Sequence, residues 1–248
     1  MNEIDNTKSS WQKIAPILQS GKKYFFHLAL EVILNAVVIA TLVIFTRFFI
    51  MAPFQVDGPS MLPNLENKDY ILINKIGYSS ILGLEIGSPQ RGDIVVLRPP
   101  TDPSVFYVKR VIGLPKDKIE IKNGNVYIYN LTHPEGFQVD EPYLSEENVE
   151  HTYLPGRSAS DSYILAEDQY FVMGDNRVHS NDSREWVSHA PFVHRNNIEG
   201  KVMFIFWPPP KIQIVHGYSY KNEILEKEFV EEKIIEKEKK LEEATQAG

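Results

Sequence analysis

The feature that most constrains the fold is an apolar segment near the N-terminus, residues 24–51 (YFFHLALEVILNAVVIATLVIFTRFFIM). Its uncharged centre has 15 residues, fewer than the 18 or more that usually cross a membrane. Extending it to residues 28–49 gives roughly 33 Å of helix at about 1.5 Å per residue, which is enough to span a bilayer. The extension includes Glu31 and Arg47 near its ends, where an arginine can reach the interface, and Asn35, which lies deeper and is unexplained. We therefore expect a retained transmembrane helix.

Three other interpretations of this segment compete with a membrane span. A cleaved signal peptide fits the short uncharged core, but the preceding segment carries acidic residues and no small-x-small site follows Thr46. A buried core helix would place its apolar residues along one stripe, and an interfacial helix would need a broad polar face; the segment has neither. Lysines outnumber acidic residues in residues 1–23, which predicts a cytoplasmic N-terminus and an outside location for everything after residue 51.

Short runs rich in Val, Ile and Tyr follow the apolar segment and indicate β-strands. The strongest local signal is Asn123-Gly124, which separates two alternating runs and is typical of a two-residue type I′ hairpin turn. Residues 131–168 are polar and irregular, so we expect loops or an insertion there. The spacing of the runs predicts a mainly β protein with an antiparallel, barrel-like domain. The expected strands lie in residues 70–76, 93–98, 107–114, 118–130 and 201–207.

Changes in composition divide the 248-residue chain into four expected parts. These are a cytoplasmic N-terminal segment (1–27), the transmembrane helix (28–50), an extracytoplasmic β-rich domain (51–215) and a charged, helical tail (216–248). In the tail, scattered apolar residues favour a solvated helix over a coiled coil or a partner-binding helix. The net charge of −7 argues against a nucleic-acid partner, and the absence of cysteine excludes disulfides, a thiol nucleophile and a thiolate zinc site.

The first candidate for chemistry is Ser60, in the segment VDGPSMLPNL just after the apolar run. Pro59 and Pro63 fix their own φ angles, and Gly58 permits a positive φ or a close approach to a ligand. Such a turn presents a hydroxyl with backbone N–H groups beside it. A plain turn serine is the alternative interpretation, and a nucleophile additionally needs a base.

Lys109 is the better candidate for that base, because the seven histidines are scattered and none has a triad context. In a strand, Lys109 shares a face with Tyr107 and Val111, which indicates burial. An ordinary lysine has a pKa of about 10.4, and desolvation can lower it by about 3–5 units. A buried amine is therefore a plausible base, whereas a lysine extending from a strand edge to solvent is the alternative.

A third patch, residues 171–186, is dense in charged and polar side chains between apolar runs. If it is buried its charges must pair, and we expect Asp182 to pair with Arg184 and Asp175 with Arg110. An ordinary polar turn is the alternative. A metal site is disfavoured because arginines alternate with the carboxylates, and we expect neither a metal nor a cofactor.

These patches together resemble the bacterial type I signal peptidases, membrane-anchored peptidases with a Ser/Lys dyad (peptidase family S26). The resemblance covers about residues 28–207, and its blocks stand in the family's order. After the transmembrane segment come VDGPSMLP (56–63), RGDIVV (91–96), YVKRVIGLP (107–115) and GDNR (174–177) followed by Ser180, Asp182, Ser183 and Arg184. Where the family often has Pro-Gly-Asp after the lysine strand, this chain has Lys116 in place of the glycine.

The resemblance implies that Ser60 is the nucleophile and Lys109 the general base of an acyl-enzyme mechanism. It implies that the Ser60 N–H contributes to the oxyanion hole. Relatives with a hydroxyl two residues before the nucleophile have an additional donor, which Gly58 cannot supply. Tyr107 would help to desolvate Lys109, and Ser180 would orient its amine. The pair Asp182–Arg184 would support the site, with Arg110–Asp175 as a further pair.

The implied substrates are the signal peptides of exported preproteins, with small residues at the first and third positions before the cut. The other implied partners are the lipid bilayer of the cell membrane and, as a further candidate, the protein export machinery. Ser60 follows Phe49 by only eleven positions, a reach of at most about 40 Å, so the nucleophile stays near the outer membrane face. Two other functions remain open, a self-cleaving repressor-like peptidase with the same dyad and a non-catalytic membrane-anchored binding module.

Overall fold

The computed structural model describes residues 25–47, 50–153 (without 77, 79, 82, 83 and 86), 162–186 and 191–220. The chain divides into two compact units, Met1–Phe48 and Phe49–Gly248. The first unit contains a 23-residue helix, Phe25–Arg47, which is long and apolar enough to cross a membrane. Of the expected cytoplasmic segment (1–27), residues 25–27 belong to this helix and the others lie outside the described residues. Of the expected helical tail (216–248), residues 216–220 form no helix and the others lie outside the described residues.

The described part of the second unit is mainly β, as the sequence predicts, and every strand pairing in it is antiparallel. Short 3₁₀ turns occur at η1 (Arg177–His179), η3 (Arg195–Asn197) and η4 (Pro209–Lys211). The strands are β1 (Met51–Gln55), β2 (Tyr70–Asn74), β3 (Ser80–Ile81), β4 (Leu84–Glu85), β5 (Ile94–Leu97), β6 (Tyr107–Gly113), β7 (Lys118–Lys122), β8 (Asn125–Tyr129), β9 (Phe137–Gln138), β10 (Ser162–Ile164), β11 (Gln169–Met173), β12 (Val193–His194), β13 (Ile198–Trp207) and β14 (Gln213–Ile214).

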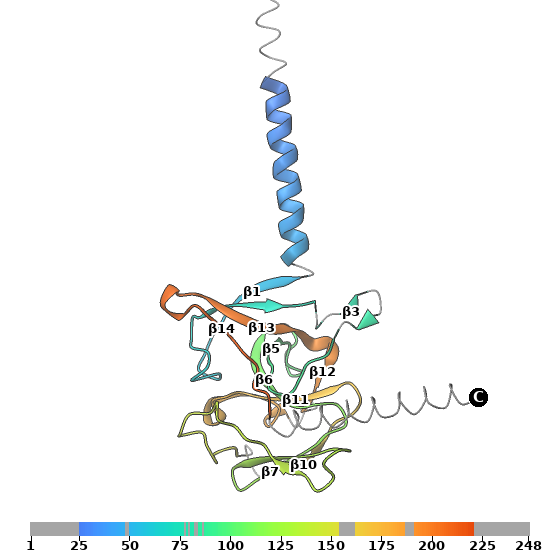
Figure 1. Ribbon diagram of the computed structural model, residues 1–248, viewed down its shortest axis with the longest axis vertical. Helices are drawn as coiled ribbons and strands as arrows, with labels where there is room; N and C mark the ends of the chain where they lie inside the picture. Colours follow the sequence, from blue (N-terminus) through green and yellow to red (C-terminus); the bar gives the residue numbers. More distant parts are fainter. Residues whose placement is uncertain are drawn as a thin grey trace, which may run out of the picture. The chain divides into compact units, whose positions relative to one another are not determined.

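The larger sheet has the order β1-β2-β13-β5-β6-β11-β12, with β14 paired to β13. Its long strand β13 shifts register against β5 and β2 at three places, and such irregularities bend a strand and increase its twist. The sheet accordingly curls, as Figure 1 shows. This curl brings the turn between β1 and β2 close to β6 and to the end of β11, although these segments are far apart in sequence.

A second sheet has the order β10-β7-β8-β9. Its central hairpin turns at Asn123 and Gly124, whose φ angles of 53° and 75° are those that a type I′ turn requires. The expectation of loops in residues 131–168 is incomplete, because β9 and β10 in this stretch pair with β8 and β7. Strands of two or three residues carry no alternation long enough to recognise in the sequence, and pairing with a preformed hairpin defines them.

Strand β5 is buried on both faces, which decides the environment of its neighbour β6. Ile94 and Val96 belong to one apolar cluster, and Val95 and Leu97 belong to another. A polar side chain on β6 that points into either layer is therefore removed from water and must find its partners inside the protein.

Candidate active site

Ser60 lies in the turn that joins β1 to β2. Gly58 has a φ of +94°, a conformation that residues with a Cβ rarely adopt, and its N–H donates to Asn67 Oδ1 at 3.1 Å. On the other side of Ser60, Met61 and Leu65 are 1% and 0% exposed and anchor the turn in the core. The turn is therefore fixed from both sides and holds Ser60 in one place.

Lys109 reaches Ser60 from β6, across 49 residues of sequence. Its Nζ lies 2.8 Å from Ser60 Oγ and donates a second hydrogen bond to the Val108 carbonyl at 2.9 Å. The lysine is 3% exposed, and its Nζ is 5.1 Å from the centre of the Tyr107 ring. The structure thus brings together the two residues that the sequence predicts as nucleophile and base, with Tyr107 beside them.

Burial lowers the pKa of Lys109 from its ordinary 10.5 to about 8. The buried carboxylates of Asp182 and Asp175 act in the opposite direction, and Arg184 adds to the lowering. Each of these carboxylates has an arginine of its own, so neither forms an ion pair with the amine. At pH 7 about one amine in ten is then neutral, compared with about one in 2,500 for a free lysine.

A pocket of about 230 Å³ opens onto the Ser60 and Lys109 side chains. Its walls come from β1, the nucleophile turn, the start of β6 and its preceding loop, and Asn181, and they are mostly apolar. A small apolar side chain of a bound peptide would fit next to the reactive hydroxyl. The pocket is lined by Phe54, Gln55, Val56, Asp57, Gly58, Pro59, Ser60, Met61, Val96, Phe106, Tyr107, Val108, Lys109 and Asn181.

The segment after β11 holds the nucleophile turn in place through backbone contacts. Asn176 N donates to the Ser60 carbonyl at 3.0 Å, and its side-chain amide donates to the Pro59 carbonyl at 3.3 Å. Gly174 packs so closely that a Cβ would lie 2.4 Å from the Ser60 carbonyl oxygen and 2.2 Å from Ser180 Oγ. The sequence does not mark Gly174 or Asn176 as site residues, because both act through contacts to backbone atoms of the nucleophile turn.

Asp182 and Arg184 form the expected pair, with hydrogen bonds of 2.8 Å from Arg184 Nε and Nη2. The second Asp182 oxygen also accepts the Gly174 N–H at 3.0 Å. Although burial alone would raise the pKa of Asp182, the arginine and this N–H hold it below its ordinary value. The pair therefore supports the backbone at Gly174, which in turn contacts the nucleophile turn.

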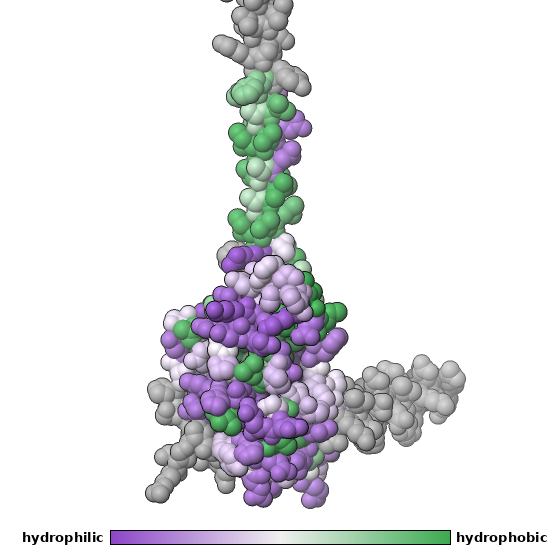
Figure 2. Space-filling view, turned by 90° about the vertical axis from the view of Figure 1, so that its left-hand side faces the viewer, coloured by the Kyte–Doolittle hydropathy of each residue, from purple (hydrophilic) through white to green (hydrophobic). Residues whose placement is uncertain are grey.

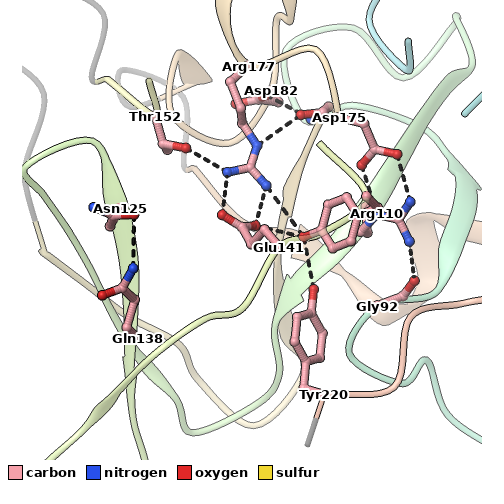
Figure 3. A network of polar contacts seen from close by, with 12 residues as sticks. Gly92, Arg110, Asn125, Gln138, Glu141, Thr152, Asp175, Arg177, Asp182 and Tyr220 are labelled. Atoms are coloured by element: carbon pink, nitrogen blue, oxygen red, sulfur yellow. Dashed lines mark hydrogen bonds and ion pairs between the residues drawn. The ribbon is translucent and has the colours of Figure 1, made fainter. Parts of the chain in front are cut away.

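Arg110 and Asp175 form the other expected pair, with bonds of 2.8 and 2.7 Å, and Figure 3 shows its two-pronged geometry. Arg110 also donates to the Gly92 carbonyl at 2.8 Å and lies 3.9 Å from the centre of the Tyr143 ring. Asn64, four residues after Ser60, donates to the same Asp175 carboxylate at 2.8 Å. Asp175 thus joins the base strand to the nucleophile turn.

A further buried arginine, Arg177, was not assigned a role from the sequence. It forms an ion pair with Glu141, donates to Thr152 Oγ1 at 2.6 Å and contacts the Gly174 carbonyl at 3.1 Å (Figure 3). Glu141 lies in the stretch expected to be loops, 36 residues away, so no local pattern connects the two. Tyr220 extends the network through a 3.0 Å contact with the Tyr143 hydroxyl.

Ser180 lies in the site, but the predicted hydrogen bond to the Lys109 amine is not formed in this structure. The residue is 6% exposed, and its hydroxyl lies against the Asp182 carboxylate, whose pKa it helps to lower. Its closeness to Gly174, described above, places it beside the backbone that holds Ser60. The orienting role of Ser180 stays a prediction.

The Ser60 N–H, predicted as an oxyanion donor, has no hydrogen-bond partner among the described residues. At the turn after β6, Lys116 adopts a φ of 72° although it is not glycine. Asp117 holds that turn by accepting from Leu114 N at 2.7 Å and from Arg91 at 2.8 Å. Within the described residues, no group of three or more His, Asp or Glu side chains could hold a metal ion.

A family model described as signal peptidase, peptidase S26, matches residues 29–207. The chain belongs to this signal peptidase family. The signal peptidase I of Pseudomonas fluorescens is 35% identical over 207 residues, which are 72% of this chain and 73% of that protein. The signal peptidase I S of Bacillus subtilis strain 168 is 38% identical over 193 residues, 76% of this chain and 92% of that protein.

Among solved structures, a signal peptidase I from Enterococcus faecalis V583 is 27% identical and matches 46% of this chain and 96% of its own, with a TM-score of 0.34. The S26 family match contains Ser60, Lys109 and the segment from Gly174 to Arg184. It ends before η4 and β14, so Tyr220 lies beyond it.

Proposed function

We propose that this chain is a membrane-anchored serine endopeptidase that removes signal peptides from exported preproteins, with Ser60 as nucleophile and Lys109 as general base. The observation that carries the dyad is the 2.8 Å contact between Lys109 Nζ and Ser60 Oγ, made by an amine whose pKa is about 8. Membership of the signal peptidase family supports the reaction and the class of substrate.

In the acylation step the neutral Lys109 amine accepts the Ser60 proton while Oγ attacks the scissile carbonyl. The Ser60 N–H donates to the oxyanion that forms, and Gly58 contributes only the backbone geometry of the turn. The ammonium then returns its proton to the leaving amine, and an ester links Ser60 to the signal peptide. Water, deprotonated by Lys109, hydrolyses this ester and regenerates the hydroxyl.

The supporting residues act through position and charge in this proposal. Tyr107 keeps water from the amine, and Ser180 accepts a hydrogen bond from it when Ser60 Oγ is engaged with substrate. The two arginine–carboxylate pairs hold the backbone on both sides of the dyad. The pocket near Gly58 and Met61 selects preproteins with small residues at the first and third positions before the cut.

We further propose that the Phe25–Arg47 helix anchors the enzyme in the cell membrane with its N-terminus in the cytoplasm and its catalytic unit outside. The lysines that precede the helix support this orientation. The substrate is tethered by its own apolar segment, so the bilayer and the protein export machinery are the proposed surroundings of the reaction.

Incubating the full chain in detergent with a purified preprotein tests the proposal. We expect Ser60→Ala and Lys109→Ala to lower kcat/KM at least a thousandfold. The matched controls are Ser104→Ala and Lys116→Ala, which change exposed residues of the same types and should retain activity. Full activity of Lys109→Ala would exclude it as the base. An inactive wild-type chain that leaves every preprotein uncut would contradict the proposed function itself.

A further inference from the structure

Two polar side chains of the N-terminal helix have no role in the proposed catalysis. Glu31 and Asn35 lie one helical turn apart on a helix whose other side chains are largely apolar, and His27 lies one turn before Glu31. Figure 2 shows polar residues along one side of this helix and apolar residues on the rest of the face in view. We call His27, Glu31 and Asn35 the polar stripe.

The two threonine hydroxyls of the helix are satisfied within it. Thr41 Oγ1 donates to the Val37 carbonyl and Thr46 Oγ1 to the Leu42 carbonyl, each at 2.8 Å. Within the described residues, the Asn35 side chain makes no hydrogen bond. Asn35 is therefore the polar group of this helix that most needs a partner.

The depth of Asn35 prevents solvent from supplying that partner. It is ten residues from Phe25 and twelve from Arg47, or about 15 and 18 Å along the helix axis. In the expected span of residues 28–49, Asn35 lies seven residues, or about 10 Å, from the nearer end, so its short side chain cannot reach either interface of a hydrocarbon core about 30 Å thick. An amide at this depth gains most by bonding to another polar group in the membrane.

We propose that the anchor helix pairs with the anchor helix of a second copy of this chain through the polar stripe. This inference rests on the proposed membrane anchoring. Two copies insert in the same orientation, so their helices are parallel and each Asn35 lies at the depth of its counterpart. An amide carries both a donor and an acceptor, which makes Asn35 complementary to itself. In the same arrangement, the His27 ring of one copy lies within one turn of the Glu31 carboxylate of the other, and a ring N–H can donate a hydrogen bond to that carboxylate.

Because the chain contains no cysteine, a single introduced cysteine can form a disulfide only with the same position of a second copy. With 3.6 residues per turn, Leu42 lies about 20° from Asn35 around the helix, whereas Ile44 lies on the opposite side. We expect the Leu42→Cys full chain, reconstituted in phosphatidylcholine–phosphatidylglycerol vesicles and oxidised with copper phenanthroline, to form at least tenfold more dimer than Ile44→Cys. Equal yields from the two positions would overturn the proposal.

The role of the amide is tested in the Leu42→Cys background. We expect Asn35→Leu to weaken dimerisation roughly tenfold, the size expected for an interhelical amide pair in a membrane. Thr41→Val is the matched control, because it removes a polar group that is already bonded within the helix, and it leaves the dimer yield unchanged. An unchanged yield in Asn35→Leu would overturn the pairing through Asn35.

Two further outcomes separate this inference from the proposed function. If benzophenone attached at Leu42→Cys in native membranes labels a different protein and no second copy, the stripe binds another partner and the self-pairing is wrong. A chain that alkaline carbonate releases from vesicles contradicts the anchoring itself. A chain that stays inserted and cleaves preprotein, but gives no Leu42→Cys dimer, overturns the pairing alone.

Discussion

Lys109 and Arg110 are neighbours on β6, 3% and 2% exposed, and they meet opposite electrostatic environments. Lys109 contacts a hydroxyl and a carbonyl, and burial lowers its pKa to about 8. Arg110 contacts the Asp175 carboxylate with two hydrogen bonds, and although burial alone would lower its pKa, the carboxylate raises it. One strand thus presents an amine that can lose its proton and a guanidinium that cannot.

The difference depends on where the carboxylates lie. A buried charge is tolerated when an opposite charge satisfies it, and it is disfavoured when only neutral oxygens do. Asp175 and Asp182 are bound by Arg110 and Arg184, so they stabilise the site without pairing with the lysine. Removing the Arg110 guanidinium should therefore lower the free energy of unfolding, whereas removing the Lys109 amine should raise it.

The largest effect is expected for Arg110→Met. It leaves the Asp175 carboxylate buried without its partner, which should lower the free energy of unfolding by about 3–5 kcal/mol. Urea unfolding of the full chain in detergent measures this loss. Arg98→Met is the control, because it removes a partly exposed pair with Glu199 and should cost less than about 1 kcal/mol. Equal stability of the two variants would contradict the comparison.

Lys109→Met should instead raise the free energy of unfolding. A pKa of about 8 in the folded protein against 10.5 in the unfolded chain disfavours the folded, protonated state by about 3 kcal/mol at pH 7. Replacing the amine should raise the free energy of unfolding by this full amount below pH 8. The gain should shrink between pH 8 and 10.5 and be absent above pH 10.5. Chemical unfolding at pH 7, 9 and 11 measures it. A gain in stability that does not shrink across this window would mean that the pKa of Lys109 is not lowered.

The pH dependence of catalysis tests the same group in the active enzyme. The neutral amine is the reactive form, so kcat/KM should fall about tenfold for each pH unit below 8 and level off above it. Because Asp182 opposes the lowering of the Lys109 pKa, Asp182→Asn should move this limb to lower pH. A profile that stays flat down to pH 5 would exclude Lys109 as the base.

The smallest effect is expected at the turn beyond β6, away from both cations. Lys116 adopts a φ of 72°, which disfavours a residue with a Cβ by about 1 kcal/mol, and its ion pair with Glu167 is exposed. Lys116→Gly should therefore stabilise the protein by about 0.5–1 kcal/mol without changing kcat/KM. Thermal unfolding checks this, and a clear loss of stability would show that the turn needs the lysine side chain.

Local sequence predicts the elements whose causes are local. The hairpin at Asn123-Gly124 and the helix Phe25–Arg47 follow from turn chemistry and from a long apolar run. The residues of the dyad are recognisable because Ser60 and Lys109 stand in constrained segments of their own. Glu141, Asn64 and Asn176 were missed, since each acts through a partner at least 36 residues away.

By itself, the sequence determined the residues available for catalysis, the membrane-spanning candidate and the strands β2, β5, β6, β7, β8 and β13. Only the tertiary structure decided that Lys109 Nζ lies 2.8 Å from Ser60 Oγ and that the two expected arginine–carboxylate pairs are buried close to it. The reason is physical, because a pKa depends on burial and on every charge within a few ångströms. Those neighbours come from the nucleophile turn, β6 and the segment after β11, which only the curled sheet and its turns bring together.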